Sequence, residues 1–233
     1  MSAWVVTDFT RNFKKKTDWY IISYICVVLR SQTSIKMSKS ENTKQFIIQK
    51  IAPVFNTKGY AGTSMSDIMD ATGLSKGCIY GNFENKDEVA LAAFEYNHGK
   101  VVEHMKARIM ATDNSIERLL VYPYTYKNYF RYPYLLAGCP ILNTSTEADD
   151  THPQLKARAG KALEFWKTSI ENQVKRGVAR KEITEKADPK EIAVVMISMI
   201  EGAFMQAKVT NRTKELKIAM EFLKKMIIGL KVK

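Results

Sequence analysis

The stretch Thr63-Ser-Met-Ser-Asp-Ile-Met-Asp-Ala-Thr-Gly-Leu-Ser-Lys-Gly-Cys-Ile-Tyr-Gly-Asn-Phe83 decides the fold, because it has the pattern of two short helices joined by a glycine turn. Ser64 is a suitable N-cap for the first helix, and Asp67 three residues later completes the spacing of a capping box. Gly73 then ends this helix in a conformation that glycine adopts most easily. The pattern therefore predicts a helix–turn–helix pair.

The second helix of the pair has an inner and an outer face. Ser75 can cap it, and Ile79 and Phe83, four residues apart, face inward. Its two glycines each cost about 1 kcal/mol relative to alanine, which indicates that another molecule approaches the backbone. A nucleic-acid phosphate would explain this, and so would a flexible surface turn; spacing alone does not separate the two. The outward residues are Lys76, Gly77, Tyr80 and Asn82.

A larger set of residues around this pair matches a known pattern. The matching residues are Ala52, Phe55, Gly59, Tyr60, Thr63, Ser64, Met65, Asp67, Ile68, Gly73, Leu74, Ser75, Lys76, Gly77, Ile79, Tyr80, Phe83 and Lys86. With them, the segment from Thr43 to Val89 resembles the N-terminal domain of the TetR/AcrR family of transcriptional regulators. Two departures are Asn82, where the family most often has histidine, and Pro53, which interrupts the first helix. The resemblance implies a three-helix DNA-binding domain whose second paired helix enters the major groove.

The net charge of +12 is not evidence for nucleic-acid binding, because of where the charge lies. Residues 37–90 contain six basic and six acidic side chains, so the positive excess falls outside the domain that resembles a DNA reader. The 233 residues, 45% of them apolar, suffice for one or two domains. Three scattered cysteines have no paired spacing, which predicts neither disulfides nor a zinc site and suits the cytoplasm.

Residues 1–36 differ from the rest of the chain. Lys14-Lys-Lys16 precedes an apolar run from Trp19 to Leu29. This run is too short to span a membrane, because a membrane-spanning helix needs about twenty apolar residues. The family resemblance begins shortly after Met37. We therefore expect residues 1–36 to be a non-native or disordered extension, with translation starting at Met37. Residues 37–88 should form the DNA-binding domain, and residues 89–233 a ligand-binding and dimerisation domain.

Apolar residues at helical spacing predict helices throughout the rest of the chain, and hence an all-α fold. The expected helices cover residues 43–58, 86–110, 115–130, 153–177, a segment opening at 189, and the segment around 216–230. The last two are apolar on more than one side, so a partner or an unusually thick monomer core must cover them. The resembled family pairs its last two helices in a four-helix bundle, which favours a homodimer.

The aromatic residues between Tyr122 and Tyr134 include six of the eleven tyrosines. Tyrosine suits the wall of a ligand pocket, although a stripe at helical spacing is more often plain core. The segment Ala137-Gly-Cys-Pro-Ile-Leu-Asn-Thr144 resembles one that adjoins the ligand cavity in part of the family. The expected effector-binding residues are Tyr122, Tyr126, Tyr129, Cys139 and Trp166.

Cys139 has two interpretations, a thiol sensor or a small buried residue. No Lys, Arg or His stands beside it in sequence to lower its pKa, which favours the buried residue. His98, His104 and His152 lack metal-ligand spacing, and we expect surface or pocket-lining positions for them. Neither a metal nor a cofactor is expected.

The resemblance implies a ligand-responsive transcriptional regulator, more often a repressor, that binds a palindromic operator as a homodimer and is released by a small-molecule effector. Phosphate contacts are expected from Thr63, Ser64, Tyr80 and Lys86, and base contacts from Lys76 to guanine and Asn82 to adenine. Gly77 completes the expected contact set. The alternative is a helical ligand-binding adaptor whose helix–turn–helix no longer binds DNA. The sequence contains no recognisable nucleophile–base pair and no phosphate-binding loop, so an enzyme is not expected. No membrane partner is expected either.

Overall fold

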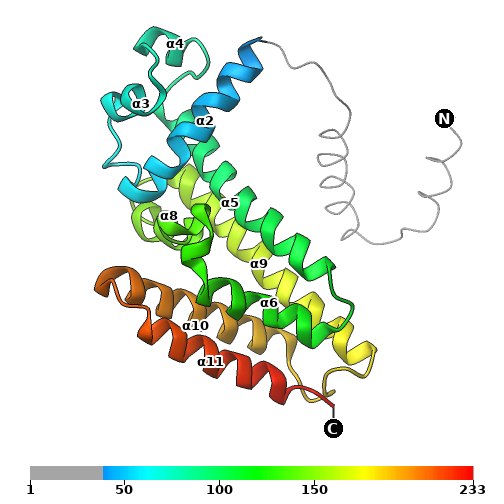
Figure 1. Cartoon of the computed structure of the whole chain (residues 1–233). Coiled ribbons are helices and arrows are strands. Elements are labelled where there is room, and N and C mark those ends of the chain that lie inside the picture. Colours follow the sequence, from blue (N-terminus) through cyan, green and yellow to red (C-terminus); the bar gives the residue numbers. More distant parts are fainter. Residues whose placement is uncertain (1–38, 233) are drawn as a thin grey trace, which may run out of the picture. The chain divides into compact units, whose positions relative to one another are not determined.

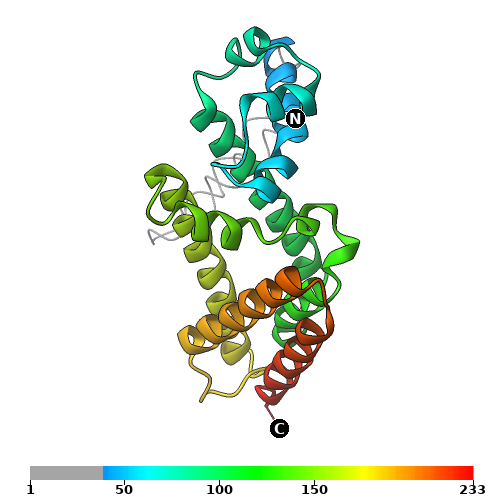
Figure 2. The same ribbon diagram turned by 90° about the vertical axis from the view of Figure 1, so that its left-hand side faces the viewer.

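The computed structural model describes residues 39–232, which form helices and short connections (Figures 1 and 2). The elements are α2 (Lys39–Lys58), α3 (Met65–Thr72), α4 (Lys76–Tyr80), α5 (Lys86–Met110), α6 (Ser115–Lys127), the 3₁₀ turn η1 (Tyr129–Arg131), α7 (Pro133–Leu136), α8 (Pro140–Ala148), α9 (Pro153–Ala179), α10 (Pro189–Thr210) and α11 (Lys214–Gly229). The helices from Thr43 onward belong to one compact unit. The all-α expectation is confirmed, while the expected extension at residues 1–36 lies outside the described residues.

The helix–turn–helix pair forms as its local sequence predicts. The hydroxyl of Ser64 accepts a hydrogen bond from the backbone N–H of Asp67, and the Asp67 carboxylate accepts one from the Ser64 N–H, at 3.1 and 2.7 Å. Gly73 ends α3 with a φ of 69°, in the left-handed region. Ser75 then caps α4 by accepting from the Cys78 N–H at 3.3 Å. These caps fix the angle at which α4 leaves α3.

The core beneath this pair is built from β-branched and aromatic side chains of α2, α3, α4 and the segment after α4. Ile47, Ile51, Ile68, Ile79 and Phe83 are all at most 2% exposed. The ammonium of Lys44 lies 4.7 Å from the centroid of the Phe83 ring and pairs with the Glu88 carboxylate at 2.5 Å. Through Phe83, the segment that follows α4 is therefore held against α2 and the start of α5.

The helices from α5 to α11 pack against one another and form the rest of the described chain. Helix α10 packs on α9 and α11, α11 packs on α6, and α8 packs on α9, as Figure 1 shows for α6, α10 and α11. Helix α5 runs through the expected domain boundary at residues 88 and 89, so both expected domains share it. Helix α10 is long and apolar enough to cross a membrane by length and composition alone, a test that core helices of soluble proteins also pass.

Two details differ from the expected helices. The helix expected over 115–130 ends at Lys127, because Asn128 leaves the helical region and the 3₁₀ turn η1 follows. Two short helices, α7 and α8, begin at Pro133 and Pro140, where proline at the first helical position fixes a suitable φ. They are too short to show a periodic pattern in sequence, and they connect the aromatic segment to α9.

Candidate DNA-binding surface and effector site

Helix α4 presents three of the expected DNA contacts on its exposed side. Lys76, Gly77 and Tyr80 are exposed, and the Lys76 ammonium lies 5.8 Å from the centroid of the Tyr80 ring. A Cβ atom at Gly77 would meet nothing within 4 Å, so no contact inside the described chain requires glycine there. This agrees with a surface that another molecule approaches closely.

Charge pairing leaves several lysines of this domain without a carboxylate partner, and both lysines of the expected contact set are among them. Lys58 pairs with Asp67 at 2.5 Å and holds the pKa of that carboxyl well below its usual range, while Lys44 pairs with Glu88. Among the described residues, Lys76 and Lys86 form no ion pair. Lys86 lies in the first turn of α5, with its ammonium 4.4 Å from the centroid of the Tyr60 ring. The neutral domain thus keeps both lysines of the expected contact set available for an anion.

Thr63 is a correction to the expected contact set. Its side chain is fully buried, and its hydroxyl donates to the carbonyl of Gly59 at 2.6 Å. Because the hydroxyl is enclosed by the turn before α3, it does not face outward towards a phosphate. Ser64 is exposed, and its hydroxyl is engaged in the cap of α3.

The Asn82 side chain is less exposed than expected. It is partly buried, and its side-chain amide donates to the carbonyl of Cys78 at 2.9 Å, at the end of α4. Its proposed contact with a base requires this hydrogen bond to be exchanged for one to DNA.

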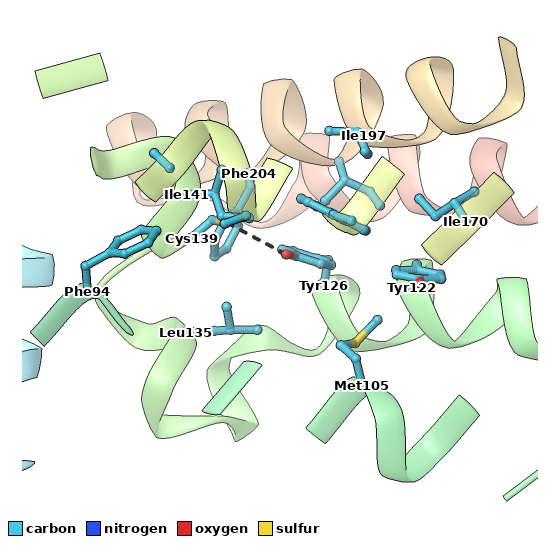
Figure 3. Close-up of a cluster of buried hydrophobic side chains, with 14 of the residues drawn as sticks. Phe94, Met105, Tyr122, Tyr126, Leu135, Cys139, Ile141, Ile170, Ile197 and Phe204 are labelled. Atoms are coloured by element: carbon cyan, nitrogen blue, oxygen red, sulfur yellow. Dashed lines mark hydrogen bonds between the residues drawn. The ribbon is translucent and has the colours of Figure 1, made fainter. Parts of the chain in front are cut away.

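The five expected effector residues lie together, on α6, η1, α9 and the residue directly before α8. The Tyr126 ring stacks on Trp166 at 5.7 Å between centroids, and its hydroxyl lies 3.8 Å from the Cys139 sulfur (Figure 3). Tyr122 also stacks on Trp166, at 6.3 Å, and its hydroxyl is 3.1 Å from that of Ser169. Tyr129 joins the group through Phe204, at 4.9 Å between ring centroids. The centre of the cluster is closed, because Tyr122, Tyr126, Cys139 and Trp166 are each at most 7% exposed, while Tyr129 at its edge is partly buried.

Cys139 has the environment of a structural cysteine. It is 1% exposed, and burial, with further effects from Glu201, raises the pKa of its thiol well above the ordinary value. A thiolate is the reactive form of cysteine, so this environment disfavours reactivity.

Sequence reasoning missed Glu201, which lies in α10 beside this cluster. Both of its carboxylate oxygens are buried and make no hydrogen bond among the described residues. Burial raises the pKa of Glu201 to about 7, and the neighbouring thiol of Cys139 lowers it in part. The available signal was its isolation, because Glu201 is the single charged residue between Ile192 and Met205.

Polar side chains join α8 and the segment before it to α2 and the turn that follows α2. The carboxylate of Glu147, in α8, accepts hydrogen bonds from the N–H groups of Tyr60 and Ala61, both at 2.8 Å. The side-chain amide of Asn56, in α2, donates to the carbonyl of Gly138 at 3.0 Å. Gly138 directly precedes Cys139, so one short segment contacts both the aromatic cluster and α2.

The three histidines occupy packed positions. His152, expected at the surface or in a pocket, is instead buried at the start of α9, where its Nδ1 accepts from the Leu155 N–H at 3.3 Å. It packs on the Tyr60 ring, at 4.5 Å between centroids. His98 stacks on Phe94, and burial lowers the pKa of His98. No group of three or more His, Cys, Asp or Glu suited to a metal occurs within residues 39–232.

Comparisons with known proteins agree with this arrangement. Residues 47–93 match the model of the bacterial regulatory proteins of the tetR family, and residues 115–223 match the tetracyclin repressor-like C-terminal domain. A TetR-family transcriptional regulator from Cytophaga hutchinsonii is 44% identical, with a TM-score of 0.81 over 84% of this chain and 98% of that chain. A second, from Chloroflexus aurantiacus, is 37% identical, with a TM-score of 0.79 and the same coverage. The transcriptional repressor NemR of Escherichia coli is 21% identical over 73% of this chain and 86% of its own length. The chain belongs to the TetR family of helix–turn–helix, DNA-binding transcriptional regulators.

Proposed function

We propose that the protein is a homodimeric repressor that binds a palindromic operator and is released by a small-molecule effector. The observation that carries this proposal is the exposed side of α4, with Lys76, Gly77 and Tyr80 outward and Lys76 without a carboxylate partner. Repression is supported by the similarity to NemR, which is itself named a transcriptional repressor. Such a protein works on DNA in the cytoplasm and needs no catalytic site.

The proposed DNA contacts divide by chemistry. Lys76 is assigned to guanine, whose O6 and N7 accept from basic side chains, and Asn82 to adenine. Ser64, Tyr80 and Lys86 are assigned to phosphates, which fix the register without reading sequence. Lys86 adds its charge to the positive end of the α5 dipole, which strengthens a phosphate contact. Gly77 allows the backbone of α4 to approach the DNA.

The homodimer is proposed to form through α10 and α11. These helices carry large apolar side chains that the described chain leaves exposed, and α11 bears a groove lined in part by Ile218 and Phe222. Exposed apolar patches of this kind mark protein interfaces. The exposed set is Val194, Met205, Val209, Ile218, Phe222 and Ile228. A two-fold axis here would place two α4 helices in successive major grooves, about one turn of DNA apart.

The effector is proposed to bind at the cluster of Tyr122, Tyr126, Tyr129, Cys139 and Trp166. Because this cluster is closed, binding must move its side chains, and Cys139 passes the movement to Gly138 and Asn56. An effector that binds the moved arrangement more tightly lowers operator affinity through that difference alone. In this proposal residues 37–88 bind DNA and residues 89–233 bind the effector and the second protomer.

Selection of bound fragments from random duplex DNA tests the proposal on the full chain. We expect enrichment of a palindrome, and a steep fall of affinity with salt, because phosphate neutralisation releases counterions. Lys76→Ala should abolish the enrichment, whereas Lys161→Ala, at an exposed position of α9, should keep it. An intact dimer that enriches no sequence would contradict the repressor and favour the ligand-binding adaptor.

A further inference from the structure

Glu201 is a buried acid without a hydrogen-bonding partner. Both of its oxygens are inaccessible to water and lack a nitrogen or oxygen donor within residues 39–232, and the weak donor Cys139 is the neighbour that acts on the carboxyl. Burying a carboxylate in this way is costly, and an unpaired buried polar group in a native fold requires an explanation. A role in packing alone does not explain it, because an apolar residue of similar size would fill the same place in α10 without the cost of burying a carboxylate.

The surroundings of Glu201 are those of the proposed effector cluster. Ile197 lies four residues before it and Phe204 three residues after, and both are buried, so Glu201 faces the core from the same side of α10. Phe204 contacts the Tyr126 ring edge-on at 5.6 Å (Figure 3). The Cys139 thiol acts on the pKa of Glu201. A second buried polar atom without a partner, the indole Nε1 of Trp166, lies on the ring that stacks against Tyr126.

We propose that Glu201 is the anionic anchor of the effector site, and that the effector is an organic amine with an aromatic or apolar body. The ammonium group pairs with the Glu201 carboxylate, and the body packs against the faces of Tyr126 and Trp166, which also attract a cation. This inference rests on the proposed effector-released function and names the chemical class of the effector.

Other classes of ligand fit the site less well. An acid or a phosphate ester would be repelled by the carboxylate, and a neutral apolar molecule would leave it unpaired. A divalent metal needs several hard ligands, and the described chain gathers no third His, Cys, Asp or Glu around Glu201 and Cys139. An amine supplies both the positive charge and the hydrogen-bond donors that the two oxygens lack.

The same site explains how an amine would act on the DNA-binding domain. Pairing with Glu201 requires the stacked rings of Tyr126 and Trp166 to part, because the cluster is closed. The Tyr126 hydroxyl lies at Cys139, and the preceding residue, Gly138, accepts the hydrogen bond from Asn56 of α2. The displacement therefore reaches the helix that supports α3 and α4 through a single short segment.

Calorimetric titration of the full chain with two isosteric probes tests the inference. 2-Naphthylmethylamine should bind at least about tenfold more tightly than 2-naphthylmethanol, because only the amine pairs with the carboxylate. Glu201→Gln and Glu201→Met should each remove this preference, and Glu191→Gln, at an exposed position of α10, should keep it. Equal affinities for the two probes, binding of neither probe, or a preference that survives in both Glu201 variants would overturn the inference.

Operator binding by the same preparations separates this inference from the proposed function. The amine should lower operator affinity of the parent chain and leave that of Glu201→Gln unchanged. A chain that binds its operator but does not prefer the amine overturns the amine site alone. A chain that prefers the amine through Glu201 but enriches no operator overturns the repressor and supports the amine site.

Discussion

At the scale of single residues, the carboxyl of Glu201 links stability to pH. Burial raises its pKa from 4.5 to about 7, so between these values the folded chain binds more protons than the unfolded chain. Stability is therefore highest below pH 4.5 for this group and falls as pH rises through about 7. The loss is about 3 kcal/mol, since one pKa unit corresponds to about 1.4 kcal/mol. Glu201→Gln should match the parent in the free energy of unfolding near pH 4.5 and exceed it by this amount near pH 8.

Urea unfolding of both proteins across this pH range measures the difference. Cys139 and Tyr126 are the titratable groups that act on or are affected by Glu201 among the described residues, and burial raises the pKa of each, so both stay neutral throughout. Other titrations are common to both proteins and cancel. A stability difference that does not change with pH would mean that the carboxylate is solvated in the folded chain.

Tyr80 and Asn82 should affect DNA binding in different ways. Tyr80 is exposed and is proposed to donate to a phosphate, so Tyr80→Ala should lower affinity about equally for operator and random DNA, by about 1 kcal/mol. Asn82→Ala should lower operator affinity by about 1–3 kcal/mol and relax the preference at one base pair. Binding isotherms on operator, single-base variants and random DNA measure both effects. If Asn82→Ala lowers stability but keeps the sequence preference, the Asn82 amide serves only to bond the Cys78 carbonyl and does not contact a base.

At the scale of elements, the turn between α7 and α8 depends on glycine. Gly138 has a φ of 119°, and a Cβ atom there would lie 2.6 Å from the side-chain nitrogen of Asn143. Asn143 in turn donates to the carbonyls of Asn56 and Ala137, at 2.9 and 3.1 Å. Gly138→Ala should therefore lower the free energy of unfolding by about 1–3 kcal/mol, through backbone strain and loss of these bonds.

Gly160→Ala is the matched control for this substitution. Gly160 lies inside α9, and a Cβ atom there would meet nothing within 4 Å. Alanine should raise stability by about 0.5–1 kcal/mol at this position, because it favours the helix. Chemical unfolding of the two variants should thus give changes of opposite sign; two changes of the same sign would contradict the assigned role of Gly138.

Local features of these elements could be predicted from the sequence, whereas long-range burial could not. The caps and stops depend on partners within four residues, so their spacing alone identifies them: Ser64 with Asp67, Gly73 and Ser75. The enclosure of Thr63 depends on how the turn before α3 folds back on Gly59, and His152 is covered by Tyr60, which is distant in sequence. The effector cluster was predicted from its aromatic residues, but Glu201 became part of it only through the packing of α10.

At the scale of the whole molecule, operator binding should depend on dimer formation. Phe222 is 62% exposed on α11, within the apolar surface proposed to bury against a second copy. Phe222→Glu would place a charge in that interface without a partner, at a cost of several kcal/mol. The variant should be monomeric at micromolar concentration by sedimentation equilibrium, and its affinity for the palindrome should fall to that for random DNA.

Met110→Glu separates the interface from general surface effects. Met110 is 67% exposed at the end of α5, outside the proposed interface, so this variant should stay dimeric and bind the operator normally. In the proposed dimer each protomer reads one half-site, and tight binding to the palindrome requires α10 and α11 to hold the two α4 helices at a fixed separation. A Phe222→Glu chain that remains dimeric and reads the palindrome would move the interface elsewhere. A monomer that still reads the palindrome with full affinity would show that single α4 helices suffice, and the two-fold model would fail.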